Sequence, residues 1–151
     1  MEELPEGRRV TQFQVIEDNV SIGKGVSISD FVKLVEGTRI GDRTLIGSYV
    51  RTGKNCIIGR DCIIKCQAVI SPNVEIGAGT TIGPGAILLH ETHQGIHSPC
   101  KIGRFCFIGA NVIVNPGVKI CDGVAVGAGA VVIRNIDLPG TYAGVPAIRI
   151  K

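Results

Sequence analysis

The sequence predicts an all-β chain wound into a single parallel β-helix of about seven triangular coils, and three repeating features predict it. An aliphatic residue recurs at every sixth position over most of the chain. Glycine directly follows that residue in many units, and a small or β-branched residue comes four positions after it. Self-similarity at a short fixed period is typical of stacked repeats.

The aliphatic residues form two series. From Ile16 to Leu88, every sixth residue is Ile or Leu in 12 of 13 cases, and the exception is Thr52. From Ile96 to Val132, all seven are Ile or Val. Since Ile and Leu together make up only 28 of the 151 residues, composition does not produce the pattern. The three- and four-residue spacing of a helix is absent, which excludes a helical reading.

Each six-residue unit reads as a short strand followed by a turn. The small residue and the aliphatic residue point inward, and the residue between them points outward. Glycine supplies the positive φ or the tight backbone that a corner demands. Three units close one coil, so each strand lies ~4.8 Å from the strand 18 residues earlier. We expect an N-terminal segment (1–15), the β-helix domain (16–137) and a C-terminal tail (138–151).

Composition excludes several classes of function. The longest apolar stretch has 11 residues, whereas a membrane-spanning helix needs ~20, so no membrane span is expected. The net charge is only +3 and aromatic residues make up 4%, which argues against nucleic-acid binding. Four of the six cysteines occupy inward slots, where a thiol is a small apolar filler. They favour a reducing, cytoplasmic location, and no metal is expected because no CxxC pair exists.

The repeat is interrupted once. Leu88 and Ile102 are 14 residues apart, two more than two repeats. The only three histidines of the chain, His90, His93 and His97, all lie at this interruption. Because loops that leave a repeat tend to carry function, we predict a short functional loop near residues 89–95.

His93 is the predicted catalytic residue. With a two-residue shift it occupies an outward slot in the middle of a strand, and Glu75 lies one coil below it, ~4.8 Å away. Histidine has an ordinary pKa of ~6.5, so it can accept a proton from an acceptor hydroxyl or amine that attacks an activated acyl group. Glu75, His90 and Glu91 are candidate supporting residues.

The same frame predicts an interface. The outward residues Val69, Ile87, Phe107 and Ala125 would form one exposed apolar column. A strip of this kind usually marks contact with another copy in a closed oligomer, with His93 near the seam.

The repeat Ile-Gly-x-x-small-x resembles the left-handed parallel β-helix of hexapeptide-repeat acyltransferases. Within this family, the segments 83–93, 101–120, 126–136 and 142–151 are similar to the maltose- and galactoside-type sugar acetyltransferases. The resemblance implies a homotrimer, acetyl-CoA as co-substrate and a sugar, sugar nucleotide or glycan precursor as acceptor. It places the catalytic histidine at His93.

The resemblance also implies a cofactor site on the C-terminal coils. There, small residues would let the pantetheine arm approach the backbone and cations would meet the nucleotide phosphates. The matching positions are Ala110, Ala128, Ile133, Arg134 and Lys151.

Two other readings stay open. A γ-type carbonic anhydrase uses the same helix with a His₃ zinc, but it takes one histidine about two coils upstream, and no histidine precedes His90 here. The second alternative is a non-catalytic hexapeptide scaffold. Metal content would test the first alternative, and acetyl-CoA binding would test the second.

Overall fold

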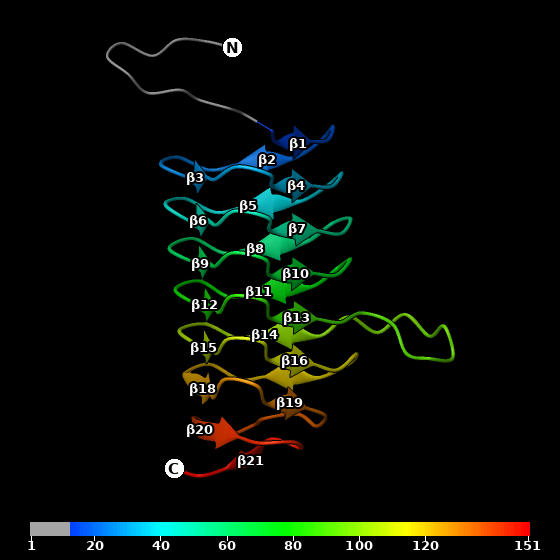
Figure 1. Ribbon diagram of the computed structural model, residues 1–151, viewed down its shortest axis with the longest axis vertical. Coiled ribbons are helices and arrows are strands. Elements are labelled where there is room, and N and C mark those ends of the chain that lie inside the picture. The colour runs from blue at the N-terminus through cyan, green and yellow to red at the C-terminus, as the bar shows by residue number, and fades with distance from the viewer. Residues whose placement is uncertain (1–12) are drawn as a thin grey trace.

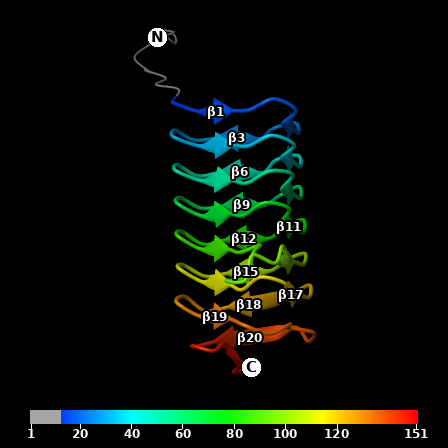
Figure 2. The same ribbon diagram turned by 90° about the vertical axis from the view of Figure 1, so that its right-hand side faces the viewer.

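A computed structural model describes residues 13–151 and shows a triangular prism built from three sheets that are parallel except for the antiparallel last strand of one of them (Figures 1 and 2). The predicted all-β parallel β-helix of about seven coils is confirmed. Most of the predicted N-terminal segment, residues 1–12, lies outside the described residues. Within 13–151 no helix is long and apolar enough to cross a membrane.

From the first strand to β19, consecutive strands occupy the three sheets in turn, as a three-unit coil requires. The first sheet contains β1 (Val15–Ile16), β4 (Lys33–Leu34), β7 (Arg51–Thr52), β10 (Val69–Ile70), β13 (Ile87–Leu88), β16 (Ile113–Val114) and β19 (Val131–Val132). The second contains β2 (Ser21–Ile22), β5 (Arg39–Ile40), β8 (Ile57–Ile58), β11 (Glu75–Ile76), β14 (Lys101–Ile102) and β17 (Lys119–Ile120). The third contains β3 (Ser27–Ile28), β6 (Leu45–Ile46), β9 (Ile63–Ile64), β12 (Thr81–Ile82), β15 (Phe107–Ile108), β18 (Val124–Val126), β20 (Gly140–Ala143) and β21 (Ile148–Arg149).

The interior of the prism is a continuous apolar column. Its aliphatic members include Ile64, Ile82 and Leu88, which are fully buried. Small residues such as Ala68 and Cys56 fill the inward slots next to the corners, as the repeat predicts. Neighbouring strands are held by a parallel ladder of backbone hydrogen bonds, such as the 2.9 Å bond from Gly77 N–H to the Ile102 carbonyl.

The glycine after each aliphatic residue is required for close approach between coils, not for positive φ. A Cβ on Gly77 would lie 2.5 Å from the carbonyl carbon of Gly103, one coil away. The left-handed backbone comes two residues later in the turn, for example at Gly79 (φ 71°) and Asp61 (φ 54°). Glycine, Asn and Asp adopt that conformation at low cost, which accounts for their frequency at the corners.

The predicted length of the insertion is wrong. The coil that contains the insertion is eight residues longer than an uninterrupted coil, not two residues longer. Ile87 of β13 pairs with Ile113 of β16, 26 residues on instead of 18. Eight extra residues are one whole six-residue unit plus two. A whole extra unit does not change the register of the repeat, so the sequence pattern showed only the remaining two residues. The loop therefore spans residues 89–100 instead of 89–95. We call it the hairpin loop, and it projects from the edge between the first and second sheets (Figure 1).

The corrected register changes the outward columns. Phe107 stacks between Thr81 and Ala125 in the third sheet and does not continue the column of Val69 and Ile87. The predicted four-residue apolar column is therefore wrong. Two strips replace it: Val69, Ile87, Ile113 and Val131 on the first sheet, and Leu45, Ile63 and Phe107 on the third, where Thr81 separates Ile63 from Phe107.

Candidate active site

The hairpin loop is closed at its base by backbone hydrogen bonds. Ser98 N–H donates to the His90 carbonyl at 2.6 Å, and Cys100 N–H donates to the Leu89 carbonyl at 3.0 Å. Leu89 N–H also bonds the Val114 carbonyl at 3.0 Å, which ties the loop to the next coil. The base of the loop is therefore an extension of the solenoid.

Further out, the loop is a small antiparallel hairpin. Glu91 and His97 form an antiparallel bridge, and Thr92 N–H donates to the Ile96 carbonyl at 3.0 Å. The Thr92 hydroxyl accepts hydrogen bonds from two backbone N–H groups of the tip, while Gly95 turns the chain with φ 75°. These bonds fix the positions of the side chains that the hairpin carries.

Glu91 links two of the three histidines. Its Oε2 lies 3.7 Å from His90 Nε2 and 3.6 Å from His97 Nδ1. The His90 side chain is only 23% exposed, while that of His97 is 72% exposed. His90 is thus the histidine that is half-buried, next to the solenoid and close to a carboxylate.

The position predicted for His93 is wrong. His93 lies exposed in the turn at the tip of the hairpin, not on a strand of the second sheet. Lys101 is the residue that pairs with Glu75 on the adjacent strand of the next coil, and its Nζ lies 2.9 Å from the Glu75 carboxylate. Glu75 therefore contacts a lysine and does not orient the imidazole of His93.

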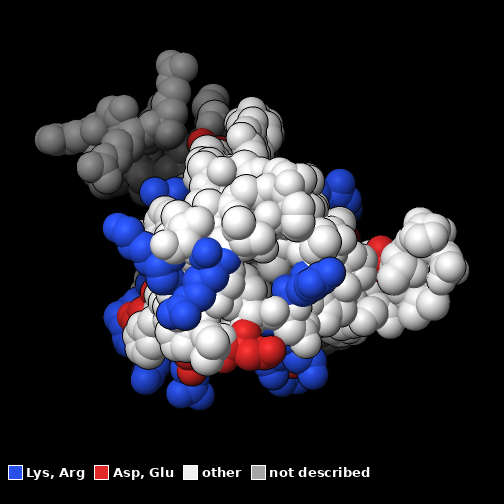
Figure 3. All heavy atoms as spheres, turned by 90° about the horizontal axis from the view of Figure 1, so that it is seen from below, with Lys and Arg blue, Asp and Glu red and all other residues white. Residues whose placement is uncertain are grey.

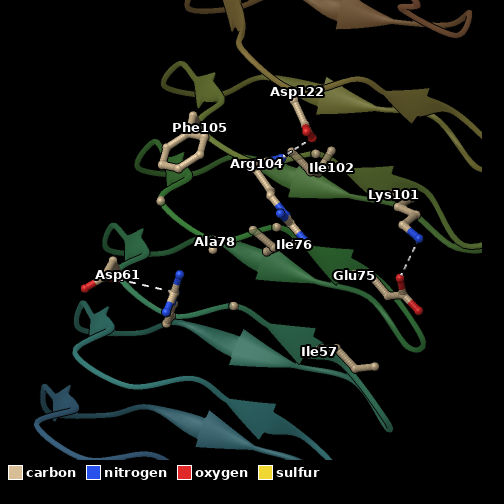
Figure 4. A pocket seen from close by; sticks show the side chains of 15 residues that line it. Ile57, Asp61, Glu75, Ile76, Ala78, Lys101, Ile102, Arg104, Phe105 and Asp122 are labelled. Carbon is tan, nitrogen blue, oxygen red and sulfur yellow. Dashed lines mark hydrogen bonds and ion pairs between the residues drawn. The ribbon is translucent and has the colours of Figure 1, made fainter.

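A groove crosses the second sheet beside the base of the hairpin loop (Figure 4). It has a volume of about 640 Å³ and extends from Glu75 and Lys101 to the corner that carries Arg60 and Arg104. Lys101 follows directly on Cys100, the last residue of the hairpin loop. One end of the groove thus lies at the base of the loop.

The groove exists because one coil has no large side chain at its corner. Arg60 and Arg104 occupy equivalent positions two coils apart, and Ala78, between Gly77 and Gly79, lies between them. Among residues 13–151 the Arg104 side chain forms no ion pair, whereas Arg60 Nε lies 4.0 Å from Asp61. The carboxylates of Asp61, Glu75 and Asp122 line the same groove. Because Arg60 is paired with Asp61 and Lys101 with Glu75, the Arg104 guanidinium is the group that is available to bind an anion.

Sequence reasoning missed this groove, although a signal for it was present. Arg60 and Arg104 both follow an Ile-Gly pair, while the coil between them reads Gly77-Ala78-Gly79. With the loop counted as eight extra residues, the three units fall into one column.

The predicted cofactor residues border one face of the prism. Ala110 and Ala128 lie on adjacent coils at the edge where β16 and β19 begin, and Gly129 N–H donates to the Ala110 carbonyl at 2.8 Å. Ile133 and Arg134 follow β19 at the opposite edge and are exposed. Lys151 is exposed at the chain end, where its carbonyl accepts a hydrogen bond from Thr141 N–H.

The face between these edges is the C-terminal part of the first sheet, where Ile113 and Val131 point outward. The hairpin loop leaves from the edge that also carries Ile133 and Arg134. The structure therefore places four of the five predicted cofactor residues around one apolar face, with the hairpin loop at its border.

Comparison with known proteins supplies the family. Residues 15–54, 37–72, 55–90 and 99–134 match the family described as bacterial transferase hexapeptide (six repeats). These matches cover well over half of the chain, and the chain belongs to this family of hexapeptide-repeat transferases. Between residues 15 and 134, the stretch that none of them covers is 91–98, the outer part of the hairpin loop. No curated protein sequence matches.

Similar solved structures include WeeI from Acinetobacter baumannii AYE, at 25% identity and a TM-score of 0.61 over 91% of this chain and 55% of WeeI. PerB from Caulobacter crescentus, solved in complex with CoA and GDP-perosamine, shows 25% identity and a TM-score of 0.50 over 92% and 55%. A maltose O-acetyltransferase from Clostridium difficile 630 shares the fold, at 24% identity and a TM-score of 0.51 over 87% and 68%. The chain spans a little over half the length of WeeI and PerB.

Proposed function

We propose that this chain is an acyl-CoA-dependent acetyltransferase that moves an acetyl group from acetyl-CoA to a hydroxyl or amine of a sugar, sugar nucleotide or glycan precursor. The observation that carries the proposal is the His90–Glu91 pair, held on a bonded hairpin at the single interruption of a hexapeptide-transferase solenoid. PerB, which shares this fold, binds CoA and GDP-perosamine.

His90 is the base that the geometry favours. Glu91 orients its imidazole, and its partial burial keeps the ring in one place beside the solenoid. In the reaction, His90 takes the proton of the acceptor hydroxyl or amine while the acceptor oxygen or nitrogen attacks the thioester carbonyl. The tetrahedral intermediate then expels CoA as thiolate, which receives the proton from the imidazolium. His93 stays the second candidate, from the tip of the same hairpin.

The apolar face of the first sheet is the proposed place for the pantetheine arm. Ile113 and Val131 offer aliphatic contact, and the small Ala110 and Ala128 let a ligand approach the edge. Arg134 at the opposite edge is placed to meet a phosphate of the nucleotide.

The groove on the second sheet is the proposed place for an acceptor that carries phosphate. Arg104 lines the hollow and forms no ion pair among residues 13–151, Arg60 lines it beside Asp61, and one end of the groove lies at the base of the hairpin loop. An acceptor anchored there by its phosphates would have its sugar near that base. This geometry favours a sugar nucleotide over a neutral oligosaccharide.

A homotrimer is the proposed assembly. Its support is the exposed apolar side chains of the third sheet, where Leu45, Ile63 and Phe107 are each at least 40% exposed. Apolar surfaces of this kind usually mark contact between protein chains.

A screen for acetylated product tests the function. Acetyl-CoA is incubated with neutral sugars, amino sugars and nucleotide sugars, and product is detected by mass spectrometry. We expect turnover with a nucleotide sugar, and an Arg104→Ala variant with a raised KM for that acceptor and little change for acetyl-CoA. Absence of acetyl-CoA binding would contradict the proposal and favour a non-catalytic scaffold.

A further inference from the structure

The hairpin loop brings three metal-binding side chains together. His90, Glu91 and His97 each place one ligand atom so that all three lie within 4.8 Å of one another. We propose that these residues bind one divalent transition-metal ion of the Zn²⁺ class, and that the bound ion inhibits acetyl transfer by occupying the imidazole of His90. The inhibition rests on the proposed function, whereas the binding stands on its own.

The spacing is close to that of a metal site. Zn²⁺ binds imidazole nitrogen and carboxylate oxygen at about 2.0–2.2 Å, so two ligand atoms of a tetrahedral site lie ~3.3 Å apart. Glu91 Oε2 is already 3.7 Å from His90 Nε2 and 3.6 Å from His97 Nδ1. Both contacts need to shorten by only a few tenths of an ångström. The two imidazole nitrogens lie within 4.8 Å of each other and must also approach, and rotations of the exposed side chains can supply these movements.

The backbone holds the ligands in place before any ion arrives. The antiparallel bridge between Glu91 and His97 fixes two of them opposite each other, and the 2.6 Å bond from Ser98 N–H to the His90 carbonyl fixes the third. A preorganised hairpin loses less conformational freedom on binding than an open loop does.

The donor set selects the class of ion. Two imidazoles and one carboxylate suit Zn²⁺ and neighbouring transition metals, whereas Mg²⁺ and Ca²⁺ prefer oxygen ligands throughout. His97 and Glu91 are 72% and 40% exposed, so water can reach a fourth coordination position. The hairpin loop contains no Lys or Arg that would repel a cation, and the loop projects away from the basic side chains of the prism (Figure 3).

Metal binding is tested with tag-free protein by isothermal titration with Zn²⁺ and by the visible absorption of Co²⁺. Cys66 is an exposed free thiol and can bind these ions, so all variants carry Cys66→Ser. We expect one ion per chain, binding weakened more than ~10-fold by His97→Ala, and no change with His93→Ala. His93 is the matched control, because it lies on the same hairpin and outside the cluster. No binding, or equal effects of the two substitutions, would overturn the metal site.

The inhibition is tested separately. Acetyl transfer is measured with and without Zn²⁺, and each variant is compared with its own metal-free rate. We expect Zn²⁺ to inhibit the Cys66→Ser protein at the concentrations that fill the site, and His97→Ala to relieve the inhibition. If the ion binds at the site but leaves the rate unchanged or raises it, the inhibition is refuted and His90 is not the base, while the metal site stands.

Discussion

A valine in place of Thr52 tests a chain of buried hydroxyl groups inside the solenoid. Thr52 occupies the one position of the first series that is not Ile or Leu. Val35 N–H donates to the Thr52 hydroxyl at 3.1 Å, Thr52 and Thr38 hydroxyl oxygens are 2.9 Å apart, and the Thr38 hydroxyl donates to the Gly53 carbonyl at 3.2 Å. Valine keeps the shape of threonine but removes the middle of this chain.

The expected loss follows from these bonds. Without the Thr52 hydroxyl, the half-buried Val35 N–H loses the acceptor that it has in the structure, and a buried polar group left unpaired costs about 1–3 kcal/mol. The methyl group that replaces the hydroxyl is buried and stabilises the folded state by about 0.8 kcal/mol. We therefore expect Thr52→Val to lower the free energy of unfolding by up to about 2 kcal/mol, although it brings the sequence closer to the repeat.

Urea unfolding at one fixed protein concentration measures the loss, because the stability of an oligomer depends on concentration. Thr38→Val and the double variant complete a mutant cycle, and we expect a coupling above ~0.5 kcal/mol between the two sites. If Thr52→Val is as stable as the wild type, or if the two effects simply add, the hydroxyl chain does not stabilise the fold.

Three further predictions concern the coils and the thiols. Gly77→Ala should destabilise the protein by ~1–3 kcal/mol in urea unfolding, because the added methyl group would clash with the next coil. Gly129 has φ 72° and open space around it, so Gly129→Ala should cost only the ~1–2 kcal/mol of a left-handed alanine. Equal stability of Gly77→Ala and the wild type would contradict the close approach between coils. Burial raises the pKa of the Cys56 thiol to about 11 and that of Cys100 to about 12. As the pH rises, these thiols ionise first in the unfolded chain. Their contribution to the free energy of unfolding should therefore be constant below pH ~8.5 and then fall by up to ~1.4 kcal/mol per pH unit for each thiol. A free energy of unfolding that does not change from pH 8 to 10 would refute this. Alkylation of the native protein followed by mass spectrometry should label the exposed Cys66 well before Cys56, and comparable rates would argue against the buried assignment.

Most of the fold could be read from the sequence. The repeat from Ile16 to Leu88 assigns inward and outward slots, and the buried positions of Ile64 and Cys56 agree with them. This prediction succeeds because, in a stacked repeat, the buried residues recur at a fixed spacing along the sequence. The same repeat cannot give the length of the hairpin loop, since whole units can be added without a change of register.

That single error displaced every outward contact after the loop. Lys101 pairs with Glu75 where His93 was expected, and Phe107 joins the third sheet. The association of His90 with Glu91 depends on hydrogen bonds within the hairpin, which have no period and leave no repeating pattern in the sequence. The sequence thus located the functional loop but not which of its side chains meet.

His90, next to Glu91, is the proposed base in acetyl transfer. The most direct test compares kcat/KM for His90→Ala and His93→Ala with the acceptor found by the screen. We expect His90→Ala to lower kcat/KM by ~10²–10⁴-fold, the typical contribution of a general base, and His93→Ala to lower it by far less. A large loss with His93→Ala and near-normal turnover with His90→Ala would contradict the account.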